Sequence, residues 1–183
     1  MPEIEVTLGT WQEAEALLGK ELSRMEGVDA VDVSGIRRKL ETLSFDSPLY
    51  RDEETARRYG YAGIPSPVSM TATWSLPAYW QPGDPSLGTR VVMPPFPLVK
   101  IPAPGTAVMG TDVESEYFEP VYVGDRITCV NRLVSIIHKR TRLGLGAFMT
   151  VESTYTKQTS EVVCIERFTT FRYTPDPAGS RAS

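Results

Sequence analysis

The chain has 183 residues, of which 41% are hydrophobic and 23% charged, and its formal net charge at pH 7 is −4. This length and composition favour a single globular domain, while the acidic balance argues against nucleic-acid binding, which favours a basic face. No apolar run approaches the roughly 20 residues that span a bilayer. Because no secretory signal pattern is visible at the N-terminus, we expect a cytoplasmic protein. Residues 1–173 are expected to form the domain, and residues 174–183 a disordered tail.

The N-terminal part of the chain predicts two short elements. Residues 11–18 place apolar side chains at helical spacing after Thr10, a capping residue that is followed three positions later by Glu13. Residues 28–33 alternate between apolar and acidic side chains, which predicts a first β-strand.

Two helices are predicted next. Ser34 is a plausible N-cap for a helix over residues 36–43, whose apolar side chains recur at helical spacing. Asp52 is a plausible N-cap for a shorter helix over residues 53–59, with acidic residues in its first turn and arginines in its last. Gly60 is expected to end that helix.

A loop and a third helix complete this region. Residues 45–50 form a loop, because Pro48 keeps the residue before it out of the α region. Ser66 is the expected N-cap of a helix over residues 68–80, with Pro67 as its first residue. This helix is apolar on nearly every side, so we expect it to be buried.

Residues 81–110 form a proline-rich insert with seven prolines and four glycines. Neither a regular helix nor a central strand tolerates that density. The insert is also too apolar for a disordered linker. Two interpretations stay open: the insert covers a partner or walls a pocket, or it folds back on its own domain.

The C-terminal half predicts a β-sheet. Short connections between strands favour antiparallel pairing, and helices followed by a run of strands predict an α+β fold. Cys129 and Cys164 lie in strand-like runs without metal-ligand spacing, so we expect two buried, reduced thiols and no metal site. The predicted strands cover residues 111–118, 126–139, 147–157 and 162–173.

Three motifs resemble the MaoC-like dehydratases, the family of 2-enoyl-CoA hydratases. Residues 44–67 are similar to the family segment that contains D-x-N-P-L-H/Y, DEEAA and GYxGIxAP. Residues 119–125, Glu-Pro-Val-Tyr-Val-Gly-Asp, are similar to the RPVRVGD entry into the family's sheet. Residues 151–155 together with Arg167 are similar to its closing strands. The resemblance covers roughly residues 28–173.

The resemblance implies a hot-dog fold, in which a curved antiparallel sheet wraps around a central helix, here residues 68–80. It also implies action on acyl thioesters. The chain most resembles the substrate-holding, FAS1-like dehydratase type, which forms the N-terminal half of fused double hot-dog hydratases.

The chain departs from the family pattern at the catalytic positions. Catalytic members use an Asp and a His in the D-x-N-P-L-H run, where this chain has Phe45 and Tyr50. Phe45 has no titratable group and Tyr50 titrates at about 10, so neither activates water near neutral pH. Asp46 lies one position too late for the pattern and remains a candidate for a lone base. We therefore expect no catalytic residues in this chain.

The candidate binding residues follow from the same motifs. The start of the third helix has free N–H groups that would stabilise charge on a thioester oxygen, although the simpler interpretation, which we favour, is that Ser66 only caps the helix. Guanidinium groups suit the phosphates of coenzyme A, although each arginine taken singly is explained as a surface charge. The candidate acyl-binding residues are Tyr50, Tyr61, Ile64, Pro65, Ser66, Pro67 and Ser69, and the candidate phosphate ligands are Arg51, Arg57, Arg58 and Arg140.

His138 is the single histidine of the chain, and it lies in the basic run His138-Lys139-Arg140. No carboxylate lies near it in the sequence, so we interpret it as a surface residue at the end of a strand. No motif for a nucleotide cofactor or zinc is present. We expect no cofactor other than coenzyme A, as part of the substrate.

These patterns lead to one hypothesis with two alternatives. The chain is predicted to be a catalytically degenerate subunit of a heteromeric MaoC-like hydratase for bulky 2-enoyl-CoA thioesters, with steroid side chains as one possible class. A partner hot-dog subunit would then supply the catalytic Asp and His. The alternatives are a non-enzymatic acyl-CoA-binding scaffold and a homodimeric thioesterase that uses Asp46.

Overall fold

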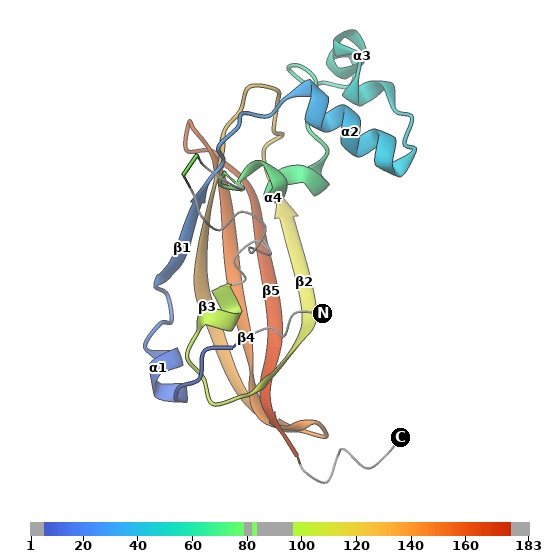
Figure 1. The fold of residues 1–183 in the computed structure, drawn as a ribbon. Coiled ribbons are helices and arrows are strands. Elements are labelled where there is room, and N and C mark those ends of the chain that lie inside the picture. The colour runs from blue at the N-terminus through green and yellow to red at the C-terminus, as the bar shows by residue number, and fades with distance from the viewer. Residues whose placement is uncertain (1–5, 79–81, 84–96, 177–183) are drawn as a thin grey trace.

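The computed structural model describes residues 6–78, 82–83 and 97–176. Its main element is a five-stranded antiparallel sheet with the strand order β1-β3-β4-β5-β2. The sheet is long and curved, with α2, α3 and α4 near one end and α1 near the other (Figure 1). The strands are β1 (Glu21–Glu26), β2 (Ala107–Tyr117), β3 (Ile127–Thr141), β4 (Gly144–Lys157) and β5 (Val162–Pro175).

The four long strands confirm the predicted antiparallel sheet, with one strand added at its edge. The sequence analysis missed β1, because Glu21–Glu26 is mostly polar and pairs on one side only, with β3. The strand predicted over residues 28–33 is wrong, because Asp32 and Val33 begin a helix instead. β5 runs to Pro175, so the first residues of the predicted tail belong to the sheet, and residues 177–183 lie outside the described part.

The helices are short compared with the strands, and most of them begin at a residue whose side chain caps the helix. Thr10 caps α1 as predicted, with a reciprocal capping box in which the Thr10 N–H donates to Glu13 Oε2 at 2.7 Å. α1 ends at Glu15, before the predicted Leu18, which instead pairs with Leu133 of β3. The helices are α1 (Trp11–Glu15), α2 (Val33–Leu43), α3 (Glu53–Arg58), α4 (Thr71–Trp74) and α5 (Pro97–Lys100), with single 3₁₀ turns at Pro48–Tyr50 and Val68–Met70.

Of the two predicted caps, that of α3 is confirmed and that of α2 is wrong. Asp32, not Ser34, caps α2: its carboxylate accepts from the Gly35 N–H at 2.9 Å and from the Ser34 hydroxyl. Asp52 caps α3 as predicted, accepting from the Thr55 N–H at 2.8 Å. Gly60 follows α3 with φ of +88°, a conformation that favours glycine.

The predicted helix over residues 68–80 is much shorter than expected. It consists of the Val68–Met70 turn and α4, which ends at Trp74. Pro77 explains the early end, because its ring clashes with the helical carbonyl four residues earlier and keeps Leu76 out of the α region. Met70 and Trp74 are buried, whereas Val68 is 57% exposed, so only one face of the segment is in the core. Residues 79 and 80 lie outside the described part.

Two hydrophobic clusters cover the concave face of the sheet. The first core cluster lies at the end of the sheet where α2 lies and packs Met70 and Trp74 with residues of α2, of the adjoining loops and of the strands: Val31, Ile36, Leu40, Val121, Ile127, Cys129, Tyr155, Val163 and Cys164. The second core cluster is formed by Ala14, Leu98, Ile101, Ala103, Leu133, Ala147, Met149 and Val151. The expected curved sheet around a helical segment is therefore present, although that segment is short.

The described end of the proline-rich insert folds back on its own domain. Leu98, Ile101 and Ala103 are buried in the second core cluster, and residues 107–110 belong to β2. The guanidinium of Arg172, 1% exposed, holds this segment by donating to backbone carbonyls alone, those of Thr7, Ile101, Ala103 and Gly105 at 2.6–3.1 Å. This supports the second interpretation for residues 97–106, while residues 84–96 lie outside the described part.

Candidate functional site

A cavity of about 150 Å³ lies where α4, the loop after α3 and the end of β2 meet. Four of the seven predicted acyl-binding residues line it: Tyr50, Tyr61, Pro65 and Ser66. The remaining wall is formed by Val68, Thr71, Tyr117, Phe118, Glu119, Pro120, Val121 and Val163. The sequence motifs therefore converge on one place in the fold, and binding by these residues remains a prediction.

Ser66 shapes the cavity through its contacts, and the prediction that it caps a helix is wrong. Its side chain makes no capping bond; its hydroxyl accepts from Trp74 Nε1 at 2.7 Å. Its backbone N–H donates to Val121 O at 2.7 Å. Ser66 is buried, so it fixes both the indole of Trp74 and the strand-side wall. The helical start after Pro67 is a single 3₁₀ turn.

The other predicted acyl-binding residues do not line the cavity. Ile64 is partly buried and packs against the first core cluster. Pro67 is half-buried and Ser69 is exposed. Two lining residues were not predicted: Tyr117, the last residue of β2, and Phe118, which follows it, although both directly precede the Glu-Pro-Val-Tyr-Val-Gly-Asp motif.

Tyr50 and Tyr117 are neutral hydrogen-bonding groups of the cavity near pH 7. Burial raises the pKa of Tyr50 above its usual value, and the nearby Tyr61 raises it further. Burial also raises the pKa of Tyr117. These phenols can therefore orient a ligand, but none of them is a base for water activation.

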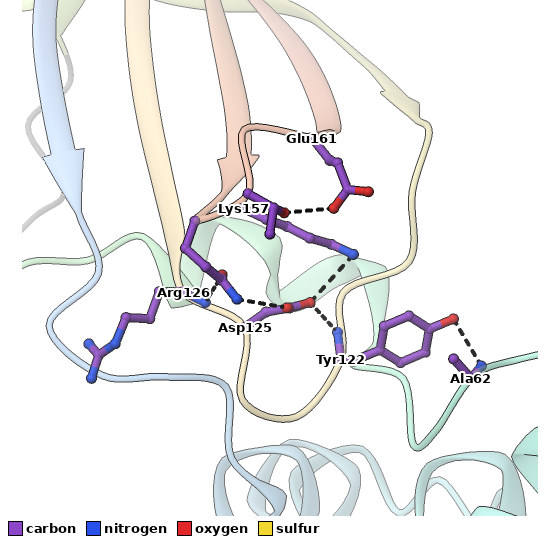
Figure 2. Close-up of polar contacts among 8 residues, drawn as sticks. Ala62, Tyr122, Asp125, Arg126, Lys157 and Glu161 are labelled. Carbon is purple, nitrogen blue, oxygen red and sulfur yellow. Dashed lines mark hydrogen bonds and ion pairs between the residues drawn. The ribbon is translucent and has the colours of Figure 1, made fainter.

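The Asp125 turn joins the strands to the loop that carries Tyr61 (Figure 2). The Asp125 carboxylate accepts from the Tyr122 N–H at 2.8 Å and pairs with Lys157 Nζ at 3.5 Å. The Tyr122 hydroxyl in turn accepts from the Ala62 N–H at 3.2 Å. The Val-Gly-Asp motif thereby positions one wall of the cavity, which gives that part of the resemblance a structural role.

The two positions that the sequence motif aligns with a catalytic Asp and His, Phe45 and Tyr50, lie close together at the cavity. Phe45 is exposed, and its ring centre lies 6.3 Å from that of Tyr50. Asp46, the alternative base, does not line the cavity; its exposed carboxylate pairs with Arg51.

The arginines predicted to bind phosphate fall into two groups. Arg51 directly follows the Pro48–Tyr50 turn, and Arg57 and Arg58 are in α3. Arg57 pairs with Glu53 at 2.6 Å, and Arg58 donates to the Thr55 hydroxyl at 3.2 Å. Arg140 is near the far end of the sheet and pairs with Asp176 at 3.3 Å. It cannot join the other three in one phosphate site.

His138 has a carboxylate partner that its sequence neighbours did not indicate. Its Nε2 lies 2.9 Å from Glu15 Oε1, and its ring packs edge-on against Trp11. Both members of this pair are half exposed. The pair lies at α1, at the opposite end of the sheet from the cavity (Figure 1). It therefore fixes α1 to β3 and is remote from the candidate site.

Further groups bear on the predicted chemistry. Cys129 and Cys164 are both buried and unpaired, as expected, and burial raises the pKa of each thiol to about 11. Within the described ranges, no cluster of three or more His, Cys, Asp or Glu side chains could hold a metal ion. None of the helices in the same part of the chain is long and apolar enough to cross a membrane.

Comparison with known proteins places this fold and cavity in a family. Residues 16–166 match the FAS1-like dehydratase domain region. The chain is 33% identical over 165 residues to a probable enoyl-CoA hydratase alpha subunit of Thermomonospora curvata, covering 88% of this chain and 51% of that protein. It is 27% identical over 126 residues to the 3-oxo-4,17-pregnadiene-20-carboxyl-CoA hydratase alpha subunit of Mycobacterium tuberculosis, covering 66% and 38%.

The fold is also found in solved structures. A chain of the ChsH1-ChsH2 complex from Mycobacterium tuberculosis superposes with a TM-score of 0.70 at 21% identity, over 91% of this chain and 92% of that one. The chain spans about half the length, or less, of the curated relatives that it matches. The family match and the curved sheet lead to one conclusion: the chain belongs to the FAS1-like dehydratase region family and is a MaoC-like protein with the hot-dog fold.

Proposed function

We propose that this chain is the substrate-binding subunit of a heteromeric MaoC-like enoyl-CoA hydratase for bulky 2-enoyl-CoA thioesters. The observation that carries the proposal is the identity of the two positions that the motif aligns with the catalytic pair, Phe45 and Tyr50, at a cavity lined by other residues of the same motif. Hydration of an enoyl thioester requires a base for water and an acid for the α-carbon. Neither side chain supplies these, so a partner hot-dog subunit, in the cytoplasm, supplies the Asp and His.

The size of the cavity supports a shared site. Ligand pockets usually enclose about 300–1,000 Å³, whereas this chain alone encloses about 150 Å³. The chain therefore holds only part of a bulky acyl group, and the partner completes the wall beyond Tyr117 and Phe118. Both curated relatives are named as alpha subunits of hydratases, and the name of one specifies a pregnadiene thioester, so steroid side chains are our first candidate substrates.

The test is reconstitution. The chain is purified alone and together with a catalytic MaoC-like hot-dog subunit, and loss of enoyl absorbance is followed with short and bulky 2-enoyl-CoA substrates. The lone chain is expected to be inactive, and the complex to hydrate the bulky substrates. Full turnover by the lone chain would contradict the proposal. A partner that works equally well on bulky substrates without this chain would favour a scaffolding role.

The thioesterase alternative has its own discriminator. It requires thiol release from simple acyl-CoA substrates by the lone chain, abolished in Asp46→Asn. The exposure of Asp46 and its pairing with Arg51 count against this activity.

A further inference from the structure

A polar row crosses the concave face of the sheet between the two core clusters. Cross-strand pairing aligns Ser23, Asn131, Ser153, Glu166 and Ser115, one residue from each strand. The preceding row along the same face contains Cys129, Tyr155 and Cys164 of the first core cluster. The following row contains Leu133 and Val151 of the second. Since directly paired side chains of antiparallel strands share a face, the polar row lies on the same face as the two core clusters. Along it Asn131 is buried, Glu166 is half-buried, and Ser115, on the edge strand β2, is exposed.

The row is adjacent to the cavity. Tyr117 lines the cavity and pairs with Cys164, while Ser115 pairs with Glu166. Ser115 and Tyr117 are two residues apart on β2, so the Ser115–Glu166 pair lies about 7 Å further along the strand on the same face. An acyl group that enters past Tyr117 and extends along β2 and β5 therefore reaches Glu166.

The two halves of the row differ in how their hydrogen bonds are used. Asn131 is buried and bonded on both sides: it donates to Ser23 at 3.0 Å and accepts from Ser153 at 2.6 Å. Glu166 is half-buried, and in the described part of the chain its carboxylate accepts one hydrogen bond, from the Ser115 hydroxyl at 3.3 Å. An ionised carboxylate has about four acceptor positions, so acceptor capacity remains at Glu166.

The surroundings of Glu166 are neutral. Burial is the largest cause that raises the pKa of Cys164 to about 11, and the negative charge of Glu166 is the next. Burial is the largest cause that raises the pKa of Tyr155 and of Tyr117, and the Glu166 charge adds a smaller contribution to each. By contrast, Glu152 on the outer face is paired with Arg167 at 2.8 Å. Glu166 is thus an inward-facing acceptor beside a ligand cavity, in a position where an apolar residue would serve packing better.

We infer that Glu166, with Ser115, is a specificity subsite that accepts a hydrogen bond from a hydroxyl group on the distal part of the acyl chain. A carboxylate accepts from a hydroxyl and repels a ketone oxygen, which is itself an acceptor. The subsite therefore selects hydroxylated acyl groups over their keto analogues. This inference rests on the proposed function, because it assumes that the cavity holds an acyl-CoA.

The experiment uses the complex with its catalytic partner and matched bulky 2-enoyl-CoA substrates. The substrates carry a distal hydroxyl, a ketone or hydrogen at the same ring position. The variant Glu166→Gln keeps the shape but adds a donor, and Ser115→Ala removes the neighbouring hydroxyl. Glu116→Gln, an exposed change on the same strand but on the opposite face, is the control. Thermal melting verifies that each variant is folded.

The wild-type complex is expected to prefer the hydroxyl substrate in kcat/KM by about tenfold, as one hydrogen bond to a charged group provides. Glu166→Gln should abolish that preference and raise activity on the ketone, while Glu116→Gln leaves both unchanged. Equal rates for all three substrates, or a preference that survives Glu166→Gln, would overturn the subsite and leave the proposed function intact. A complex that hydrates none of the substrates would overturn both.

Discussion

Arg172 provides the sharpest test of how the proline-rich insert is held. Its guanidinium donates to four backbone carbonyls and has no carboxylate partner among the described residues. Burial lowers its pKa, but an arginine remains charged. Through these bonds Arg172 holds Thr7, near the N-terminus, and the end of the insert against β5. The side chain therefore connects three parts of the chain that are distant in sequence.

The expected effect of Arg172→Met follows from the donors that remain. Thr7 O and Ala103 O keep backbone donors, from Ala103 and Gly9, whereas Ile101 O and Gly105 O have no other donor in the described part of the chain. Each buried carbonyl left without a partner costs about 1–3 kcal/mol. For these two carbonyls we therefore expect a loss of about 2–6 kcal/mol. At the middle of that range, about 4 kcal/mol, the melting temperature of a chain of this size falls by roughly 8–16 °C.

Urea unfolding followed by tryptophan fluorescence and circular dichroism measures this loss. Arg167→Met is the matched control, because its partner Glu152 is on the outer face and such pairs contribute about 1 kcal/mol or less. Arg172→Lys should be intermediate, since an ammonium cannot reach carbonyls in a planar fork. If Arg172→Met were as stable as Arg167→Met, this connecting role of Arg172 would be refuted.

Two further predictions concern aspartates with defined partners. Asp125→Ala should destabilise the fold by about 2–4 kcal/mol in urea unfolding, because it leaves the nearly buried Lys157 unpaired. The control, Glu161→Gln at an exposed position, should change the stability little. Equal effects of the two substitutions would contradict the account of the turn. Asp32→Ala should cost about 1 kcal/mol at pH 7. The Ser34 hydroxyl and then the Gly35 N–H hold the Asp32 pKa below its usual 3.8. The stability difference between wild type and Asp32→Ala should therefore persist above pH 3.8 and shrink as the pH falls through the folded pKa. A stability difference that widened in acid would refute the cap.

The sheet was predictable because its strands are long and rich in β-branched and aromatic residues. β1 was not, since its residues are mostly polar and only tertiary pairing with β3 selects them as a strand. The overlong helix after Ser66 had a visible signal against it: Pro77 excludes a continuous helix to Trp80. The apolar residues between Ser66 and Pro77 reflect packing against the sheet rather than helix propensity.

The candidate site was predictable where it is local and not where it depends on register. Tyr50, Tyr61 and Ser66 come from one contiguous motif, so the resemblance identified them together. Glu166 could not be found in this way. Its inward direction follows only from the pairing of β5 with β2 and β4, which no sequence motif encodes.

Catalytic side chains supplied by another subunit are the central claim, and mutation of each subunit within the assembled complex tests it most directly. In one complex the Asp and His of the partner's D-x-N-P-L-H run are replaced by Asn and Gln. In the other, this chain carries Asp46→Asn and His138→Gln. The account predicts that hydration of a bulky 2-enoyl-CoA is abolished in the first complex and unchanged in the second. Turnover that survives the partner's substitutions, or is lost with those in this chain, would contradict it.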